Sequence, residues 1–145
     1  MFKKIKLILS IFLFINFFNL LLAGENFFEE AKHKFNEKKL EDSKFLFQRN
    51  IVFNPKHAKS YLYLAKIYNS EENQREEEKN LNTVLLLEPA NEEAMHMLIN
   101  IELKKSNYSK IKELMESFSI ICSNLCEKIV TINETLKNIE PKNES

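Results

Sequence analysis

Two cysteines are the most chemically conspicuous residues of this chain. Cys122 and Cys126 lie in the stretch ICSNLC, and the chain has no other cysteine. Such a thiol pair can form a disulfide, bind a metal or exchange electrons with a partner. A metal or redox role favours the closer Cys-x-x-Cys spacing or nearby histidines, whereas His33, His57 and His96 are distant in sequence. We expect a structural disulfide in an exported protein, with two separate thiols as the alternative and a thiol redox protein as the least favoured.

No other residues form a catalytic or metal-binding pattern. None of the histidines has a second ligand at helical spacing. No Ser, His and Asp arrangement or pair of carboxylates indicates catalysis, and the charged run Glu71–Lys79 is typical of a solvated helix start. Basic and acidic side chains balance at 21 each, which gives no charge excess for nucleic acid. We therefore expect no catalytic residue, no metal, no cofactor and no nucleic-acid partner.

The N-terminus has the layout of a secretory signal peptide. A lysine-rich start is followed by the apolar run Leu7–Leu22, and the small residues Ala23 and Gly24 come directly after this run. We predict a signal peptide over residues 1–23, cleaved after Ala23, and an exported protein of a bacterial periplasm. The alternative is an uncleaved anchor, since Ile5–Ala23 is about long enough to span a bilayer. The protein would then be held in the inner membrane and face the periplasm.

The rest of the chain carries an internal repeat of 34 residues. Each copy has two amphipathic segments with apolar residues three and four apart, joined by a short polar stretch, and this pattern predicts a helical hairpin. At this offset aromatic, aliphatic, small and proline residues coincide in the sets Phe27, Tyr61, Met95; Ala31, Ala65, Ile99; Phe47, Leu81, Met115; Phe53, Leu87, Ile121; and Pro55, Pro89.

This pattern resembles the tetratricopeptide repeat (TPR) family, whose unit carries an aromatic residue, Leu-Gly, Tyr, Ala, Phe and Pro at set offsets. The second copy matches best, through Tyr61, Leu64, Ala65, Tyr68, Leu81 and Pro89. Each copy departs from this pattern. Lys34 replaces the Tyr in the first copy, Glu77 replaces the small residue in the second copy, and Ser123 replaces the proline in the third copy. The resemblance covers residues 24 to about 125.

The resemblance implies an all-α fold, a right-handed α-solenoid of three helical hairpins plus a C-terminal capping helix. The predicted repeats are residues 24–57, 58–91 and the divergent 92–124. Small side chains at Ala31, Ser43 and Ala65 let paired helices approach to about 8–10 Å. Pro55 and Pro89 end the second helix of a repeat because proline cannot continue it.

The last repeat of a solenoid needs a cover for its apolar face. We predict a capping helix over Leu125–Ile139, with Asn124 as its N-cap and Glu127 in a capping box. The disulfide would link the last repeat to this cap. Residues 140–145 are predicted to be a frayed tail. The apolar face of the cap consists of Ile129, Ile132, Leu136 and Ile139.

In this family the first helices of successive repeats line a concave groove that binds a peptide or a partner helix. The resemblance therefore implies a non-catalytic protein–protein interaction module, with a partner segment that is acidic and apolar. Two alternatives stay open, namely a membrane-anchored accessory subunit of an envelope complex and a homodimer. The positions of a chaperone-binding carboxylate clamp are not filled by suitable residues. The implied groove residues are Phe28, Lys32, Phe35, Lys59, Leu62, Lys66, Asn69, His96, Asn100 and Leu103.

Overall fold

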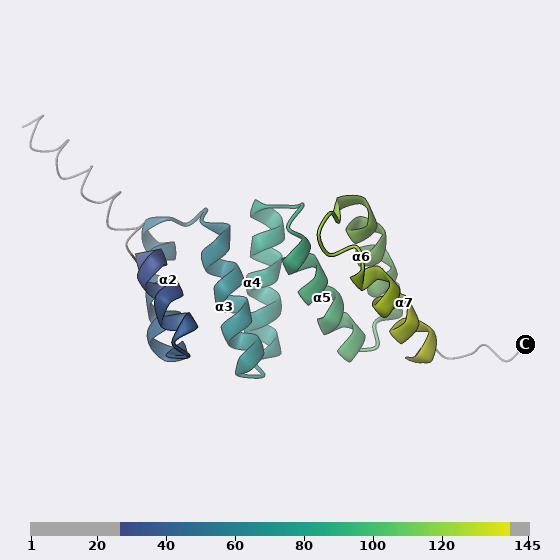
Figure 1. Ribbon diagram of the computed structural model, residues 1–145, viewed down its shortest axis with the longest axis horizontal. Coiled ribbons are helices and arrows are strands. Elements are labelled where there is room, and N and C mark those ends of the chain that lie inside the picture. The colour runs from purple at the N-terminus through teal and green to yellow at the C-terminus, as the bar shows by residue number, and fades with distance from the viewer. Residues whose placement is uncertain (1–26, 140–145) are drawn as a thin grey trace, which may run out of the picture. The chain divides into compact units, whose positions relative to one another are not determined.

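The described part of the protein is helical throughout (Figure 1). The computed structural model describes residues 27–139, and no β-strand occurs among them, so the predicted all-α class is confirmed there. The predicted signal or anchor over residues 1–23 and the predicted tail over residues 140–145 lie outside the described residues. Helical residues 27–36 are followed by α2 (Leu40–Phe53), α3 (Ala58–Ser70), α4 (Gln74–Leu87), α5 (Glu92–Lys104), α6 (Tyr108–Ile121) and α7 (Lys128–Ile139).

Contacts divide the chain into two compact units, one ending at Ile67 and one beginning at Tyr68. We call residues 27–67 unit 1 and residues 68–139 unit 2. Between residues 27 and 139, no helix combines the length and the apolar character that crossing a bilayer requires.

The turns within the hairpins repeat with the period of the sequence. Lys38, Glu72 and Ser106 have positive φ angles of 62°, 56° and 55°. In each turn the N–H of this residue donates to the carbonyl oxygen three residues earlier, and the next N–H donates to the carbonyl oxygen five residues earlier. This is the Schellman type of helix end, which usually places glycine at the left-handed position. Because the only glycine of the chain is Gly24, a side chain occupies each turn at a cost of about 1–2 kcal/mol.

Asparagine side chains cap three of the helices. Each side-chain oxygen accepts a hydrogen bond from a backbone N–H of the first helical turn, which is worth about 1 kcal/mol. The pairs are Asn73 with Glu76, Asn91 with Ala94 and Asn107 with Lys110, at 3.3, 3.0 and 3.4 Å.

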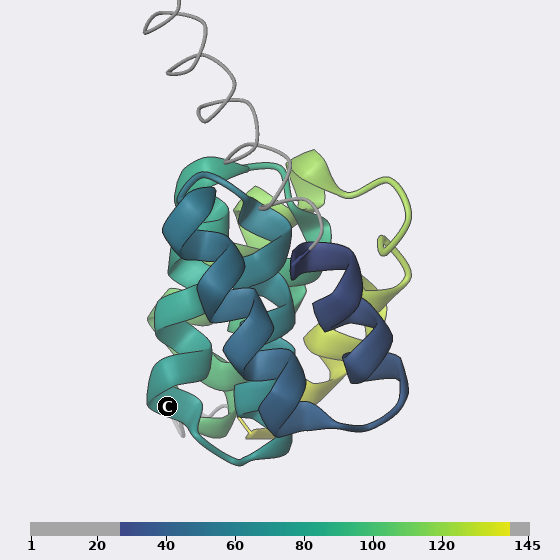
Figure 2. The same cartoon turned by 90° about the vertical axis from the view of Figure 1, so that its left-hand side faces the viewer.

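Unit 1 joins a tight helix pair to the first part of α3. Figure 2 shows the helical residues 27–36 beside α2, to which a short turn connects them. Ala31 and Ser43 are fully buried, as the need for small side chains predicts, and the Ser43 hydroxyl donates to the Ala31 carbonyl oxygen at 2.8 Å. The buried apolar residues of this unit are Ala31, Phe47, Ala58, Leu62, Leu64, Ala65 and Ile67.

Unit 2 has a core of mainly aliphatic residues, in which α4 packs against α5, α5 against α6 and α6 against α7. Ile132 and Leu136 of α7 are buried, so two residues of the predicted capping face do cover apolar surface. The other buried apolar residues are Leu81, Val84, Ala94, Met95, Leu98, Ile99, Ile101, Ile111, Leu114, Met115 and Phe118.

The predicted start of the capping helix is wrong. The helix begins at Lys128, three residues after Leu125, and Asn124 lies in the preceding bend. Asn124 does not cap the helix, because it lies four residues before Lys128. Its backbone N–H, which Glu127 would accept in a capping box, donates instead to the Glu92 carboxylate at 3.0 Å. A long-range acceptor on α5 has thus displaced the local capping box that the sequence suggested.

Candidate functional site

Four aromatic rings meet in unit 1 around Tyr63. The Tyr63 ring stacks on Phe47, with centroids 4.9 Å apart, and receives the edges of Phe28 and Phe35 at 5.9 and 5.1 Å. Phe28 and Phe35 are seven residues apart, so they share one face of the first helix. Phe47 is fully buried, whereas the other three rings are half-buried. The cluster therefore presents aromatic surface at the boundary between core and solvent.

Ammonium groups accompany these rings. Lys66 follows Tyr63 by one helical turn, and its Nζ lies 5.0 Å from the centroid of the Tyr63 ring, which is a cation–π contact. Lys32 is half-buried and lies between Phe28 and Phe35 in the same helix. We call Phe28, Lys32, Phe35, Tyr63 and Lys66 the aromatic–lysine face. Such a face can hold an apolar side chain against the rings and a carboxylate near the ammonium groups.

Sequence reasoning missed Tyr63 and selected its neighbour Leu62. Leu62 is only 7% exposed and lies in the core, so its side chain contributes packing rather than accessible surface. Two neighbouring residues in a helix point about 100° apart, and the repeat pattern alone did not show which of them faces outward. The spacing of Tyr63 and Lys66, which puts both on one helix face, was the available indication.

Phe28 also contacts the turn before α3. Its ring meets the His57 ring edge-on at 4.5 Å, and His57 Nδ1 lies 2.9 Å from the Ser60 hydroxyl oxygen. Phe28 and the predicted residue Lys59 both line a cavity of about 720 Å³ at this turn. The structure thus brings together Phe28, Phe35 and Lys66 at Tyr63, and Phe28 and Lys59 at the cavity.

The predicted groove residues of unit 2 have other surroundings. The His96 ring lies 6.3 Å from Phe118, and its Nε2 is 3.5 Å from the amide nitrogen of Asn100. Burial, and to a lesser degree the charge of Lys128, lower the pKa of His96, which favours the neutral imidazole. Leu103 is half-buried. His96 and Asn100 therefore form a neutral polar pair.

Asn69, another predicted groove residue, supports a buried acid. Its amide nitrogen donates to Glu77 at 2.9 Å, and Glu77 is only 3% exposed. Burial raises the pKa of Glu77, while the hydrogen bond from Asn69 and the charge of Lys104 oppose this rise. The amide of Asn69 thus donates to the carboxylate of Glu77, which stands where the repeat pattern has a small residue.

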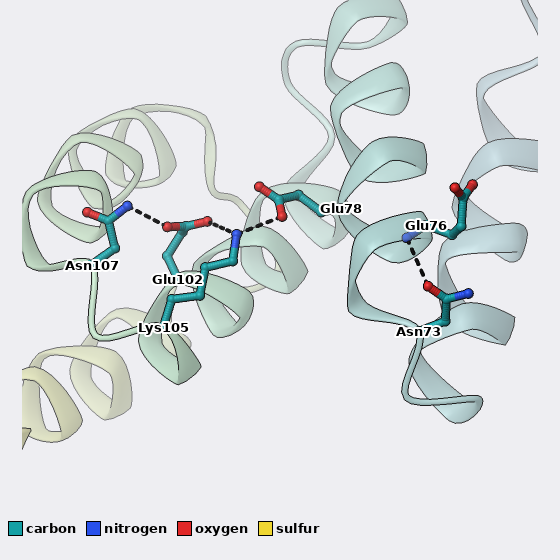
Figure 3. Close-up of polar contacts among 6 residues, drawn as sticks. All are labelled: Asn73, Glu76, Glu78, Glu102, Lys105 and Asn107. Carbon is teal, nitrogen blue, oxygen red and sulfur yellow. Dashed lines mark hydrogen bonds and ion pairs between the residues drawn. The ribbon is translucent and has the colours of Figure 1, made fainter.

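A second buried acid, Glu102, organises a polar network in unit 2 (Figure 3). Its carboxylate accepts hydrogen bonds from Lys105 Nζ at 3.0 Å and from the Asn107 amide at 2.7 Å. Lys105 also donates to Glu78 of α4 at 2.6 Å, so one ammonium group ties α4 to the end of α5. This bond with Glu78, more than that with Glu102, raises the pKa of Lys105 against the opposing effect of burial. The network stabilises turns, and no group of three potential metal ligands occurs among the described residues.

The cysteine loop between α6 and α7 is held by one carboxylate. Glu92 of α5 accepts hydrogen bonds from the Ser123 hydroxyl at 2.7 Å and from the backbone N–H groups of Asn124 and Leu125 at 3.0 and 2.8 Å. These bonds, first of all the one from Ser123, lower the pKa of Glu92 to about 2.

Because α6 ends at Ile121 and α7 begins at Lys128, Cys122 and Cys126 do not share a helix. Their Cα atoms are 5.2 Å apart and their sulfur atoms form a close pair.

Solved structures of TPR domains are similar to this chain. The Arabidopsis OM64 TPR domain has a TM-score of 0.72 at 12% identity and covers 83% of this chain and 99% of its own. The TPR2B domain of yeast Sti1, in a complex with pHsp70, has a TM-score of 0.73 at 13% identity, with coverage of 82% and 99%. The Yersinia enterocolitica type III secretion chaperone SycD, in complex with a peptide of the translocator YopD, has a TM-score of 0.68 at 14% identity, with coverage of 79% and 90%.

These similarities show the fold. The chain has the tetratricopeptide repeat fold, the all-α solenoid that the sequence predicts. No protein-family model matches the sequence, and no curated protein matches it either.

Proposed function

We propose that this chain is a non-catalytic protein-binding module that holds an acidic and apolar segment of a partner protein. The observation that carries the proposal is the aromatic–lysine face, where the Phe35 and Tyr63 rings meet and Lys66 lies over Tyr63. Lys32 lies between Phe28 and Phe35 in the sequence of the first helix. Rings remove apolar side chains from water, and ammonium groups attract carboxylates. Neighbours of the same fold are complexes with pHsp70 and with a YopD peptide, which is consistent with binding of protein segments.

The test is capture of a partner from the native envelope by the tagged, full-length chain. Replacing Lys32→Glu and Lys66→Glu together should abolish capture, because both positive charges of the aromatic–lysine face are reversed. A matched control, Lys38→Glu with Lys137→Glu, makes the same change in charge at two exposed lysines outside the predicted groove residues. Equal capture by both double variants would rule out this face as the binding surface.

The proposal extends to export, since the N-terminal 23 residues have the composition of a signal peptide or an anchor. The N-terminal mass of the purified protein separates the two. A chain that starts at Gly24 supports a cleaved, periplasmic module, whereas a chain that retains Met1 and stays with the membrane supports an anchored accessory subunit.

We further propose that Cys122 and Cys126 form a structural disulfide in the exported protein. Their Cα separation of 5.2 Å falls within the range of disulfides, and the break between α6 and α7 removes the strain that a continuous helix would impose. Intact-mass analysis under non-reducing conditions should show the loss of two hydrogens. A reduction potential above about −200 mV would instead favour a redox role.

A further inference from the structure

The cavity of about 720 Å³ in unit 1 is a second feature of this surface. It lies between the first residues of the helix 27–36, the end of α2 and the turn that leads into α3. Its size falls within the range of about 300–1,000 Å³ that ligand pockets occupy, so it has room for more than one side chain.

Two phenylalanines form its apolar walls, and both are fixed by other rings. Phe53 stacks on Phe27 with centroids 5.6 Å apart, and the Arg49 guanidinium covers Phe27 at 4.4 Å. Phe28 is held by His57 at 4.5 Å and by Phe47 at 5.7 Å. The walls are therefore in place without a ligand, which reduces the entropy cost of binding.

The polar groups inside the cavity are already satisfied. Asn50 is 1% exposed, and its amide nitrogen donates to the Ser60 hydroxyl at 2.8 Å. Its side-chain oxygen accepts from Asn54 at 3.4 Å. A bound group does not have to supply hydrogen bonds to Asn50, so the inner part of the cavity suits an apolar group.

The charges at the rim are different. Lys56 and Lys59 line the cavity, are exposed, and have no carboxylate partner among residues 27–139. Among the described residues of the lining, Glu29 is the only acidic one, so the two lysines exceed it by one positive charge. The rim thus complements one carboxylate, while the walls complement an apolar group.

We propose that this cavity is a subsite for a partner segment in which a carboxylate adjoins a large apolar side chain. The apolar group lies between Phe28 and Phe53, and the carboxylate pairs with Lys56 and Lys59. The carboxylate is that of an acidic side chain next to the apolar residue, since the proposed partner segment is both acidic and apolar. This inference rests on the proposed function, since it names the chemistry of part of the bound segment, and it adds contacts away from Lys32 and Lys66.

The experiment uses the full chain, purified in the state in which the cell leaves its N-terminus, and needs no natural partner. Four probes are titrated while the ring signals of Phe28, His57 and Tyr63 are followed by NMR. They are N-acetyl-phenylalanine, its amide, the blocked dipeptide N-acetyl-aspartyl-phenylalanine amide, and inorganic phosphate. A dissociation constant on the order of 1 mM is expected for ligands of this size.

We expect a carboxylate probe to shift the Phe28 and His57 signals, with about tenfold weaker binding of the amide, because the amide loses the charge-assisted bond. The aspartyl dipeptide should bind more tightly than N-acetyl-phenylalanine, and the reverse preference would overturn the assignment to an acidic side chain. Lys56→Glu and Lys59→Glu should each remove the preference for an acid, whereas Lys38→Glu, on another turn of unit 1, should retain it. Unchanged Tyr63 signals in the free variants verify that they fold.

Equal binding of acid and amide, binding of phosphate as strong as that of the acids, or shifts at Tyr63 without shifts at His57 would each overturn the subsite. So would the absence of any shift at concentrations well above the expected constant. These results leave partner capture through Lys32 and Lys66 untouched, whereas loss of the proposed function would appear in the capture assay alone.

Discussion

Units 1 and 2 consist of similar helices but bury different chemistry. Unit 1 packs the rings of Phe28, Phe47 and Tyr63 together. Its buried polar residues are neutral and hydrogen-bonded, as in the contact of Asn50 with Ser60. Unit 2 has a core of mainly aliphatic residues and buries the carboxylates of Glu77 and Glu102 with amide or ammonium partners. The same repeat thus tolerates either rings or paired acids at its helix contacts.

This difference in buried chemistry gives the two units different roles: unit 1 offers a binding surface, whereas unit 2 is stabilised by paired charges. Rings at the edge of unit 1 remain half-buried and can contact a partner through their apolar surface. In unit 2 the shifted pKa values of Glu77 and Glu92 make stability depend on pH. The partly exposed ion pair of Lys105 with Glu78 is weakened by salt. We therefore expect mutations to affect binding mainly through unit 1, and solution conditions to affect stability mainly through unit 2.

The largest effect is expected from Phe47→Ala in unit 1. Phe47 is fully buried against two rings, so its truncation should lower the free energy of unfolding by about 3–5 kcal/mol, measured by urea denaturation. Amide hydrogen exchange should show that Phe47→Ala lowers protection in residues 27–67. The matched change Phe118→Ala should lower protection in residues 68–139. Equal loss in both units after either change would break the distinction between them.

Reduction of the cysteine pair should be the next largest effect. For so short a loop the chain-entropy model gives about 2 kcal/mol of stabilisation. Treatment with a reductant should therefore lower the melting temperature and the protection of α7 in unit 2. The double variant Cys122→Ser with Cys126→Ser serves as the control and should not respond to the reductant. A wild-type chain that is equally insensitive would contradict the proposed disulfide.

The acids of unit 2 should give opposite pH dependences of stability. The pKa of Glu92 falls in the folded state from its ordinary value of 4.5 to about 2, so its stabilisation is present above pH 4.5 and is lost as pH falls towards 2. The pKa of Glu77 is raised by burial, so the folded state binds the proton more tightly and stability rises as pH falls through that raised value towards 4.5.

Thermal unfolding across pH 2–7 of Glu92→Gln and Glu77→Gln tests both signs. The first variant should be less stable than the wild type at neutral pH, with a difference that disappears near pH 2. The second retains an acceptor for Asn69 and should lack the gain in stability on acidification. If the melting temperatures of both variants changed with pH in parallel with those of the wild type, protonation of neither carboxylate would be coupled to folding.

The smallest effect is expected from Glu78→Gln, which removes one partner of Lys105. Both side chains are about one-third exposed, so the pair should contribute only about 0.2–1 kcal/mol. The difference in melting temperature between variant and wild type should shrink in about 0.5 M salt, where exposed charges are screened. A salt-independent difference would mean that Glu78 acts through packing.

The sequence predicted the helices well because their spacing is set by local pattern. The offset that aligned Phe47 with Leu81 and Met115 also places the turns at Lys38, Glu72 and Ser106, and two of the three aligned core residues are fully buried. Burial of Ala31 and Ser43 followed from the need for close helix contact. The pattern failed at Asn124, because a carboxylate more than thirty residues earlier competes for the same N–H group.

For the candidate site, the sequence alone indicated Phe28, Phe35 and Lys66 and their mixture of apolar and basic character. Only the tertiary structure revealed Tyr63 as the ring that joins them, and the interior position of Leu62. It also showed that the Asn69 amide donates a hydrogen bond to Glu77 and that Lys59 lines a cavity. The reason is physical: periodicity along the chain fixes which residues share a helix face, whereas contacts between helices decide which of those side chains remain accessible.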